Sequence, residues 1–347
     1  MNANNEKIKN AIIKISKVRG ILNKLNFDDG SVRDVIEKVD LSFDFIKCFD
    51  RKPVIGFFGQ FDAGKSTLVN SLTNDGILPT NYQPATCVIN ILMHEDDRPE
   101  HINSKVAIFR QGFKPYMISE KALCKKYLVE DGGESTLKKL GAHSYNESSL
   151  SGAHVAVIFS NAEILKSTWL LDTPGTMNEF NSDDGEKALS ALALVDGIIF
   201  LSRVSGFMSD SEIYYLSELL KQRPPLNFKR PLEHVFIVQS HCHSEISLEQ
   251  IEDIKRIACL RAQKRLEKLV FIDWMNKNHI KEIPSSKCMA ERVFPFWRES
   301  DELCLNVRNK IGDMSYFFSD KHSDLISAGI LNIENKLADT LRGAMKS

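Results

Sequence analysis

The sequence predicts an α/β protein with a mostly parallel sheet of six strands or more, helices on both faces and a helical segment at the N-terminus. Short apolar runs, each long enough for one buried strand, recur from residue 53 onward. Polar stretches of helical length separate the later runs. Strands that alternate with helices in this way indicate a parallel sheet that is covered on both sides.

The first fifty residues predict helices. Apolar side chains recur at spacings of three and four from Ile8 to Leu25, and a second amphipathic stretch follows the break at residues 26–31. This pattern suits either a helical hairpin that packs on its own domain or a bundle that another segment or a partner completes.

The remaining elements follow in order. The predicted strands are residues 53–58, 86–94, 154–159, 167–175, 196–204, 233–240 and 292–297. The predicted helices are residues 65–76, 183–194, 211–222, 247–280 and a closing amphipathic helix at 329–343. Residues 95–150 are polar and charged, and we expect an insertion made of excursions and flexible loops more than core.

Composition narrows the class of protein. The chain has 347 residues, 43% of them hydrophobic and 26% charged, which is ordinary for a globular protein. Its formal net charge of −1 gives no global attraction to nucleic acid or to an anionic membrane. Seven scattered cysteines without a CxxC pair, and a polar start without the apolar core of a signal peptide, predict a cytoplasmic protein that is at most peripheral to a membrane.

Residues 59–66 form a phosphate-binding pattern, G-x-x-x-x-G-K-S, between a predicted strand and a predicted helix. Its glycines let main-chain N–H groups curl around phosphate oxygens at the helix N-terminus. Lys65 would reach the β- and γ-phosphates, and the Ser66 hydroxyl would ligate Mg²⁺. The predicted nucleotide-binding residues here are Gly59, Gln60, Phe61, Asp62, Ala63, Gly64, Lys65, Ser66 and Thr67.

Two later features fit the same site. Asp172 ends an apolar run and begins the sequence DTPG, so that it suits a carboxylate near Mg²⁺ while the N–H of Gly175 senses the γ-phosphate. Thr86 precedes a predicted strand and is the candidate loop threonine that closes over Mg²⁺ and the γ-phosphate. Thr80 competes for this role.

These motifs resemble the successive blocks of a bacterial dynamin-like GTPase, a P-loop GTPase of the dynamin superfamily. The blocks are GQFDAGKSTLVNSL, ILPTNYQPATCVINIL, VAVIFSNAEILKSTWLLDTPGTMNEF and VDGIIFLSRVSGFMSDSEIYYL, and they cover about residues 53–240. The resemblance implies GTP hydrolysis with Mg²⁺, activation by dimerisation across the nucleotide face, and catalytic roles for Lys65, Thr86 and Gly175. It assigns Mg²⁺ to Ser66, Thr86 and Asp172. It also implies a neck-like helical segment at residues 1–50 and a GTPase domain at 51–347.

The resemblance gives Asp62 a further role. The family carries a polar residue at this position of the loop, and that residue can ligate a monovalent cation. Asp62 is therefore a candidate ligand for K⁺ or Na⁺. A turn or cap residue is the alternative.

The sequence departs from the family where guanine is read. An (Asn/Thr)-Lys-x-Asp sequence should follow residues 233–240, but the chain continues into His241, Cys242 and His243. Gln239 or Ser240 is a candidate hydrogen-bond partner of the base, and His241 is a candidate stacking residue. A zinc site at these three residues is a weaker alternative, because no second cluster of ligands is evident.

The long helical stalk and membrane-binding tip of dynamins are not recognisable either. The expectation is a truncated chain, a partner chain that supplies those parts, or a protein that does not remodel membranes. Partners would be a second copy or a heteromeric dynamin-like chain, with membrane contact through the partner and no nucleic acid. The alternatives in function are a nucleotide-loaded interaction module with little hydrolysis and an NTPase without guanine specificity.

Overall fold

The structure is a computed structural model. It describes residues 45–78, 88–133, 152–174, 183–223, 232–278 and 282–344, with the single residues 13, 17, 20, 37, 40, 41 and 136. By internal packing the chain divides into two compact units. One comprises residues 53–315, and the other residues 1–52 and 316–347.

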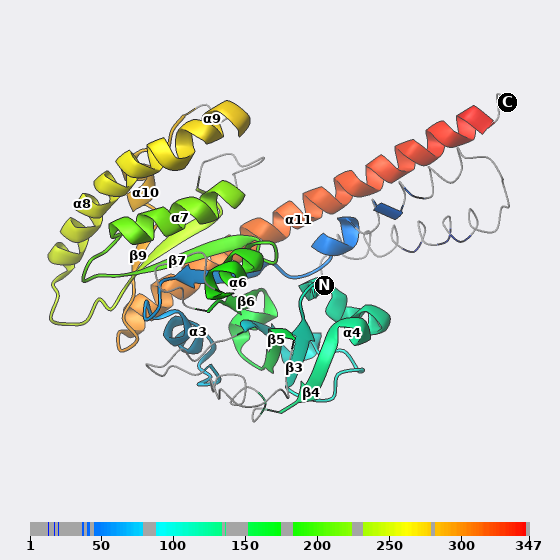
Figure 1. The fold of residues 1–347 in the computed structure, drawn as a ribbon, viewed down its shortest axis with the longest axis horizontal. Helices are drawn as coiled ribbons and strands as arrows, with labels where there is room; N and C mark the ends of the chain where they lie inside the picture. Colours follow the sequence, from blue (N-terminus) through cyan, green and yellow to red (C-terminus); the bar gives the residue numbers. More distant parts are fainter. Residues whose placement is uncertain are drawn as a thin grey trace. The chain divides into compact units, whose positions relative to one another are not determined.

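A nine-stranded sheet forms the centre of the larger unit, in the order β4-β3-β5-β2-β6-β1-β7-β8-β9 (Figure 1). Its strands are β1 (Val54–Gly59), β2 (Ile89–His94), β3 (Val106–Arg110), β4 (Leu128–Gly132), β5 (Ala153–Ser160), β6 (Trp169–Asp172), β7 (Gly197–Arg203), β8 (Val235–Ser240) and β9 (Val293–Pro295). Five neighbouring pairs are parallel and three are antiparallel. The prediction of a mostly parallel sheet of six strands or more is confirmed.

The parallel strands β6, β1, β7 and β8 end at the same edge of the sheet. Their register pairs Phe57 with Asp172, Gly59 with Leu201, and Arg203 with Ser240. The carboxyl ends of these four strands therefore lie side by side, which is where open α/β sheets bind their ligands.

The prediction that residues 95–150 form loops more than core is partly wrong, because this insertion contributes two strands to the sheet. β3 pairs with both β5 and β4, and Val106, Ala107, Ile108 and Phe109 are fully buried. Burial of this apolar run against β5 outweighs the polar composition of the flanking residues. The part of the insertion at residues 137–151 lies outside the described residues.

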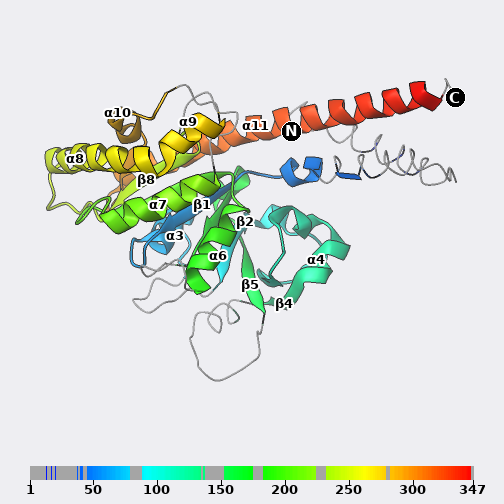
Figure 2. The ribbon, with the colours of Figure 1, turned by 45° about the horizontal axis from the view of Figure 1, so that its top comes forward.

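Helices cover the sheet. Among them are α3 (Lys65–Thr73), α4 (Lys121–Tyr127), α6 (Asp183–Leu192), α7 (Asp210–Gln222), α8 (Leu248–Leu266), α9 (Ile272–Asn278), α10 (Ser286–Ala290) and α11 (Asp301–Ala344), with a π-helical stretch at Glu267–Phe271 between α8 and α9. α7 and α8 lie side by side (Figure 2) and share a core with alternate residues of the sheet, among them Phe58, Ile198 and Phe200. α3 packs against β1 and β6.

Two of these helices begin with a capping box. Ser209 caps α7 and Ser247 caps α8, each through reciprocal hydrogen bonds with the residue three positions later, Glu212 or Gln250. Glu212 is buried and also accepts a hydrogen bond from Ser202 Oγ at 3.0 Å. The start of α7 is therefore attached to β7.

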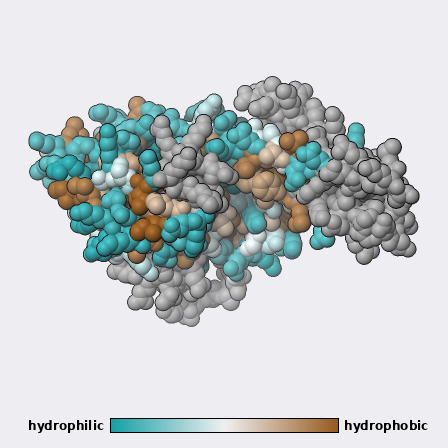
Figure 3. Space-filling view, turned by 90° about the horizontal axis from the view of Figure 1, so that it is seen from above, coloured by the Kyte–Doolittle hydropathy of each residue, from teal (hydrophilic) through white to brown (hydrophobic). Residues whose placement is uncertain are grey.

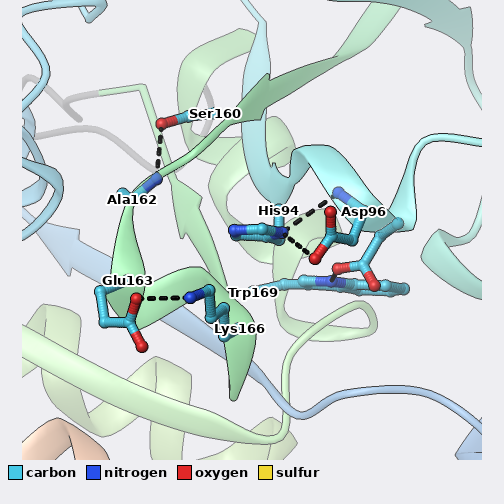
Figure 4. A network of polar contacts seen from close by, with 8 residues as sticks. His94, Asp96, Ser160, Ala162, Glu163, Lys166 and Trp169 are labelled. Atoms are coloured by element: carbon cyan, nitrogen blue, oxygen red, sulfur yellow. Dashed lines mark hydrogen bonds and ion pairs between the residues drawn. The ribbon is translucent and has the colours of Figure 1, made fainter.

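A polar network ties the end of β2 to the start of β6 (Figure 4). His94 Nδ1 accepts a hydrogen bond from the Asp96 N–H at 3.1 Å, and Trp169 Nε1 donates to Asp97 Oδ2 at 2.8 Å. Because β6 runs from Trp169 at this edge to Asp172 at the other, the network lies at the sheet edge opposite the predicted phosphate loop. We therefore assign this network to the connection between β2 and β6 and not to the predicted nucleotide-binding site.

The closing helix is longer than predicted. Residues 329–343 are its last part, and α11 begins at Asp301 and runs for 44 residues. Gly312 and Gly329 do not interrupt it, since glycine weakens a helix without ending it. Across the described residues, no helix combines the length and the apolar character needed to cross a bilayer.

The smaller unit joins the end of the N-terminal segment to α11. The Phe49 ring lies 5.0 Å from that of Phe45 and 5.2 Å from that of His322, measured between centroids. Gly329 leaves room for Ile46, whose Cγ1 would be 2.9 Å from a Cβ atom placed at that glycine. A side chain at residue 329 would therefore displace Ile46.

Among the described residues of the larger unit, the buried thiols are those of Cys124, Cys242 and Cys259. Burial raises the pKa of each to about 11.

The surface in Figure 3 is mainly hydrophilic and carries separate apolar groups. Single exposed apolar residues, such as Leu248 and Ile257 of α8, are common on soluble proteins.

Candidate nucleotide-binding site

The loop between β1 and α3 has the backbone that its glycines predict. Gly59 has φ 153° and Gly64 has φ 86°. A Cβ atom at Gly59 would lie 2.6 Å from the main-chain oxygen of Leu201, and one at Gly64 would lie 3.3 Å from Cε1 of His241. Both positions therefore favour glycine for conformation and for space.

The start of α3 is open to an anion. Its N-cap is Gly64, which has no side chain to accept a hydrogen bond from the first turn. The main-chain N–H groups of a helix N-terminus and the positive end of the helix dipole together favour a phosphate group at this point.

Lys65 lies over the loop. Its Nζ donates to the main-chain oxygens of Gly59 and Gln60, each at 3.0 Å. Burial lowers the pKa of Lys65 to about 8, and the carboxylates of Asp172 and Asp62 act in the opposite direction. A phosphate beside this ammonium would supply the charge partner that the two carbonyls supply only in part.

Ser66 and Asp172 meet at the carboxyl end of β6. Ser66 Oγ donates to Asp172 Oδ2 at 2.8 Å. Asp172 is fully buried, and its other oxygen, Oδ1, has no hydrogen-bond partner among the described residues. Burial raises the pKa of Asp172 to about 6, against the effects of Lys65 and of the Ser66 hydroxyl.

This pair fits a magnesium ion. A hydroxyl and a buried carboxylate with an unpartnered oxygen are hard oxygen donors, and Mg²⁺ uses few protein ligands beside water and phosphate. The part of the chain that is described holds no cluster of three or more His, Cys, Asp or Glu side chains that could hold a metal ion. Thr173 Oγ1 donates to the main-chain oxygen of Phe57 at 2.7 Å and attaches the residue after β6 to β1.

Ser240 and His241, predicted to contact the base, lie against the loop. Ser240 Oγ donates to the main-chain oxygen of Ala63 at 2.8 Å, and the residue is 1% exposed. His241 has the left-handed φ of 62°, and its ring faces Gly64. Burial lowers the pKa of His241, and the nearby Arg203 lowers it further, while Asp62 acts in the opposite direction.

The neighbouring residues do not form a zinc site. Cys242 is buried and donates its Sγ proton to the main-chain oxygen of Gln239 at 3.1 Å. The His243 ring lies near that of Trp297, with 6.1 Å between the centroids. The described residues therefore give no support to the zinc alternative.

The structure adds two contacts that the motifs did not predict. Gln60 Nε2 donates to Ser211 Oγ at 2.8 Å, and Arg203 Nη2 lies 3.0 Å from Asp62 Oδ2. Arg203 is the last residue of β7, and the sequence predicted this segment only as a strand.

The other predicted residues are placed as follows. Phe61 and Thr67 lie within the loop and the first turn of α3, both partly buried. Thr86, its competitor Thr80, and Gly175 lie outside the described residues. Their roles stay predictions.

Comparison with known proteins places the chain in a family. The model of the dynamin family matches residues 55–232, just over half of the chain. Dynamin-like protein 2 of Campylobacter jejuni subsp. jejuni serotype O:23/36 (strain 81-176) is 26% identical over 169 residues, which are 47% of this chain and 23% of that protein. The bacterial dynamin-like protein of Nostoc punctiforme (strain ATCC 29133 / PCC 73102) is 22% identical over 165 residues, 48% of this chain and 22% of that protein.

Among solved structures, an oligomerised bacterial dynamin pair matches with a TM-score of 0.48 and 14% identity, over 99% of this chain and 57% of that one. The chain spans less than a quarter of the length of the two curated relatives. The family match, which runs from β1 past the DTPG turn and through α7, confirms the resemblance seen in the motifs: the chain belongs to the dynamin family.

Proposed function

We propose that the protein binds GTP together with Mg²⁺ and hydrolyses the bond between its β- and γ-phosphates. The observation that carries the proposal is the arrangement of Lys65, Ser66 and Asp172 around an uncapped helix N-terminus, with one carboxylate oxygen of Asp172 unpartnered. Membership of the dynamin family supports it.

The residues of the chain would act by position and charge. Lys65 would exchange its two loop carbonyls for phosphate oxygens, and the N–H groups at the start of α3 would hold the β-phosphate. Ser66 and Asp172 would hold Mg²⁺, which supplies positive charge to the phosphate oxygens during transfer. Thr86 and the N–H of Gly175 are the proposed contacts to the γ-phosphate and the attacking water.

Recognition of the base decides between GTP and ATP as the substrate. The Ser240 hydroxyl already donates to the main-chain oxygen of Ala63. We therefore propose that the His241 ring, which faces Gly64, contacts the base by stacking. Stacking alone accepts either purine. An NTPase without guanine specificity is therefore the second candidate function.

Dimerisation across the nucleotide face would complete the site. The matched bacterial dynamin pair is described as oligomerised and as tethering membranes, and we extend only the pairing to this chain, as a homodimer or with a dynamin-like partner. Membrane contact would come through the partner, with the protein in the cytoplasm or at the inner membrane face.

The division into a neck-like segment at residues 1–50 and a GTPase domain at 51–347 stays a proposal. The packing of Ile46 and Phe49 against the C-terminal half of α11 supports a neck made from both ends of the chain.

Titration with fluorescent GTP, ATP and GDP, with and without Mg²⁺, tests the binding proposal. Hydrolysis is then measured over a range of protein concentrations. We expect Mg²⁺-dependent binding, slow turnover that rises with protein concentration, and loss of both in Lys65→Ala. Lys277→Ala removes an exposed lysine of α9 and serves as the control.

Tight binding of GTP without turnover at any concentration would favour the nucleotide-loaded interaction module. Equal affinity for GTP and ATP would favour the unspecific NTPase. Turnover that does not depend on concentration would contradict the dimer.

A further inference from the structure

An ion pair joins the phosphate loop to β7. Arg203 Nη2 lies 3.0 Å from Asp62 Oδ2, and the two side chains are 44% and 38% exposed. The parallel register that pairs Gly59 with Leu201 brings Arg203 beside the loop. The main chain of Arg203 is thus held in the sheet, where the residue also pairs with Ser240 of β8.

Asp62 is an unusual residue for its place. Its φ of 63° is left-handed, which costs a non-glycine residue free energy, although aspartate tolerates it better than most. A carboxylate in a loop that faces phosphates also repels the ligand. Charge in this position is tolerable only beside a cation.

Stability does not explain the pair. An exposed ion pair contributes about 0–1 kcal/mol to folding. What the pair does change is the charge beside the loop, because it cancels Asp62 and leaves Lys65 to face the phosphates.

We propose that Arg203 is a resident arginine of the nucleotide site: its guanidinium, anchored on Asp62, neutralises that carboxylate and contacts the phosphate chain of the bound triphosphate. Arginine suits this role because its planar fork of donors can bond a carboxylate and a phosphate together. The inference rests on the proposed function. It also makes the guanidinium the cation at Asp62, where the sequence predicts K⁺ or Na⁺.

The test compares hydrolysis in KCl, NaCl and choline chloride at equal ionic strength for the wild type, Arg203→Ala, Asp62→Ala and the double variant. We expect wild-type turnover to be the same in the three salts. Arg203→Ala should lower kcat on the order of 10²-fold, the effect of removing one charge-stabilising donor. Potassium should then restore part of the rate in Arg203→Ala, but not in the double variant, which lacks the carboxylate.

Arg256→Ala is the matched control. Arg256 pairs with Asp253 at 3.2 Å on α8 and is at least as exposed, so its removal takes away an arginine and an ion pair without touching the loop. Its kcat should stay within twofold of the wild type.

Two readouts do not depend on turnover. Arg203→Ala should weaken the binding of a non-hydrolysable GTP analogue about tenfold more than that of GDP, because the lost contact is to the phosphate chain near the γ-phosphate. The pKa of His241, followed by NMR, should rise in the same variant, because Arg203 lowers it.

The proposal is overturned if Arg203→Ala keeps kcat and the ratio of the two affinities within twofold of the wild type. It is also overturned if wild-type turnover requires K⁺ and loses that requirement in Asp62→Ala, which would support the monovalent ion. Absence of wild-type turnover in every salt would contradict the proposed hydrolysis, and the affinity ratio would still decide the role of Arg203.

Discussion

Replacement of Asp172 by asparagine should stabilise the nucleotide-free protein while it removes Mg²⁺-dependent nucleotide binding. The carboxylate is fully buried, and burial raises its pKa from 3.8 to about 6. Each pKa unit corresponds to ~1.36 kcal/mol, so the charged form disfavours the folded state by about 3 kcal/mol. Asparagine retains an oxygen that accepts from Ser66 and carries no charge.

The stabilisation by Asp172→Asn should increase as the pH rises. A carboxyl group whose pKa is raised on folding penalises the folded state above that pKa, and the penalty disappears as the pH falls through about 6 toward 3.8. The difference in unfolding free energy between Asp172→Asn and the wild type should therefore be largest at pH 8 and small at pH 4.5.

Urea denaturation followed by tryptophan fluorescence, at several pH values and in EDTA, measures this difference. Asp253→Asn on the surface of α8 is the control and should change stability by less than about 0.5 kcal/mol. A stabilisation that is equal at pH 4.5 and pH 8, or a destabilised variant at pH 8, would refute the reasoning that burial of the charge dominates. Retained Mg²⁺-dependent binding in Asp172→Asn would contradict the assignment of this residue to the metal.

Two further predictions concern the elements that hold the loop. Gly59→Ala should abolish nucleotide binding and lower the unfolding free energy by about 1–3 kcal/mol, because the new Cβ would lie 2.6 Å from a main-chain oxygen. Gly206→Ala is the control, because φ is also positive there but no atom lies within 4 Å of the new Cβ. Comparison of the two variants separates the steric cost from the conformational cost. Ser209→Ala should cost about 1 kcal/mol through loss of the α7 capping box, and it should cost more than Ser247→Ala on α8, because the partner Glu212 is buried; equal losses in urea denaturation would contradict this order.

The residues that sequence reasoning placed well are those whose role is local. The loop from Gly59 to Ser66 follows from its own spacing, and the strands β1, β7 and β8 follow from apolar runs that are buried on both faces. Their order along the chain was enough to predict the edge at which the site lies.

The features that the sequence did not predict depend on contacts between residues that lie far apart in the sequence. β3 is a strand because β5 and β4 lie beside it, and its five residues alone cannot be told from part of a polar loop. α11 buries apolar side chains along its length, among them Val307, Met314 and Ile326, while its mixed composition gave a signal only at its end. The partner of Asp62 is 141 positions away, and no local pattern names it.

Labelling of the buried thiols Cys124, Cys242 and Cys259 would report when the structure around each of them opens. At pH 8 a thiol with a pKa of about 11 is a thiolate in only about one molecule in a thousand, and burial shields it as well, so alkylating reagents can react only when the surrounding structure opens. Cys124 lies in α4 of the insertion, Cys242 directly follows His241, and Cys259 lies in α8. The rate at which each thiol is labelled, with and without nucleotide, would therefore time the opening of the insertion, of the base side of the site and of the helical layer separately.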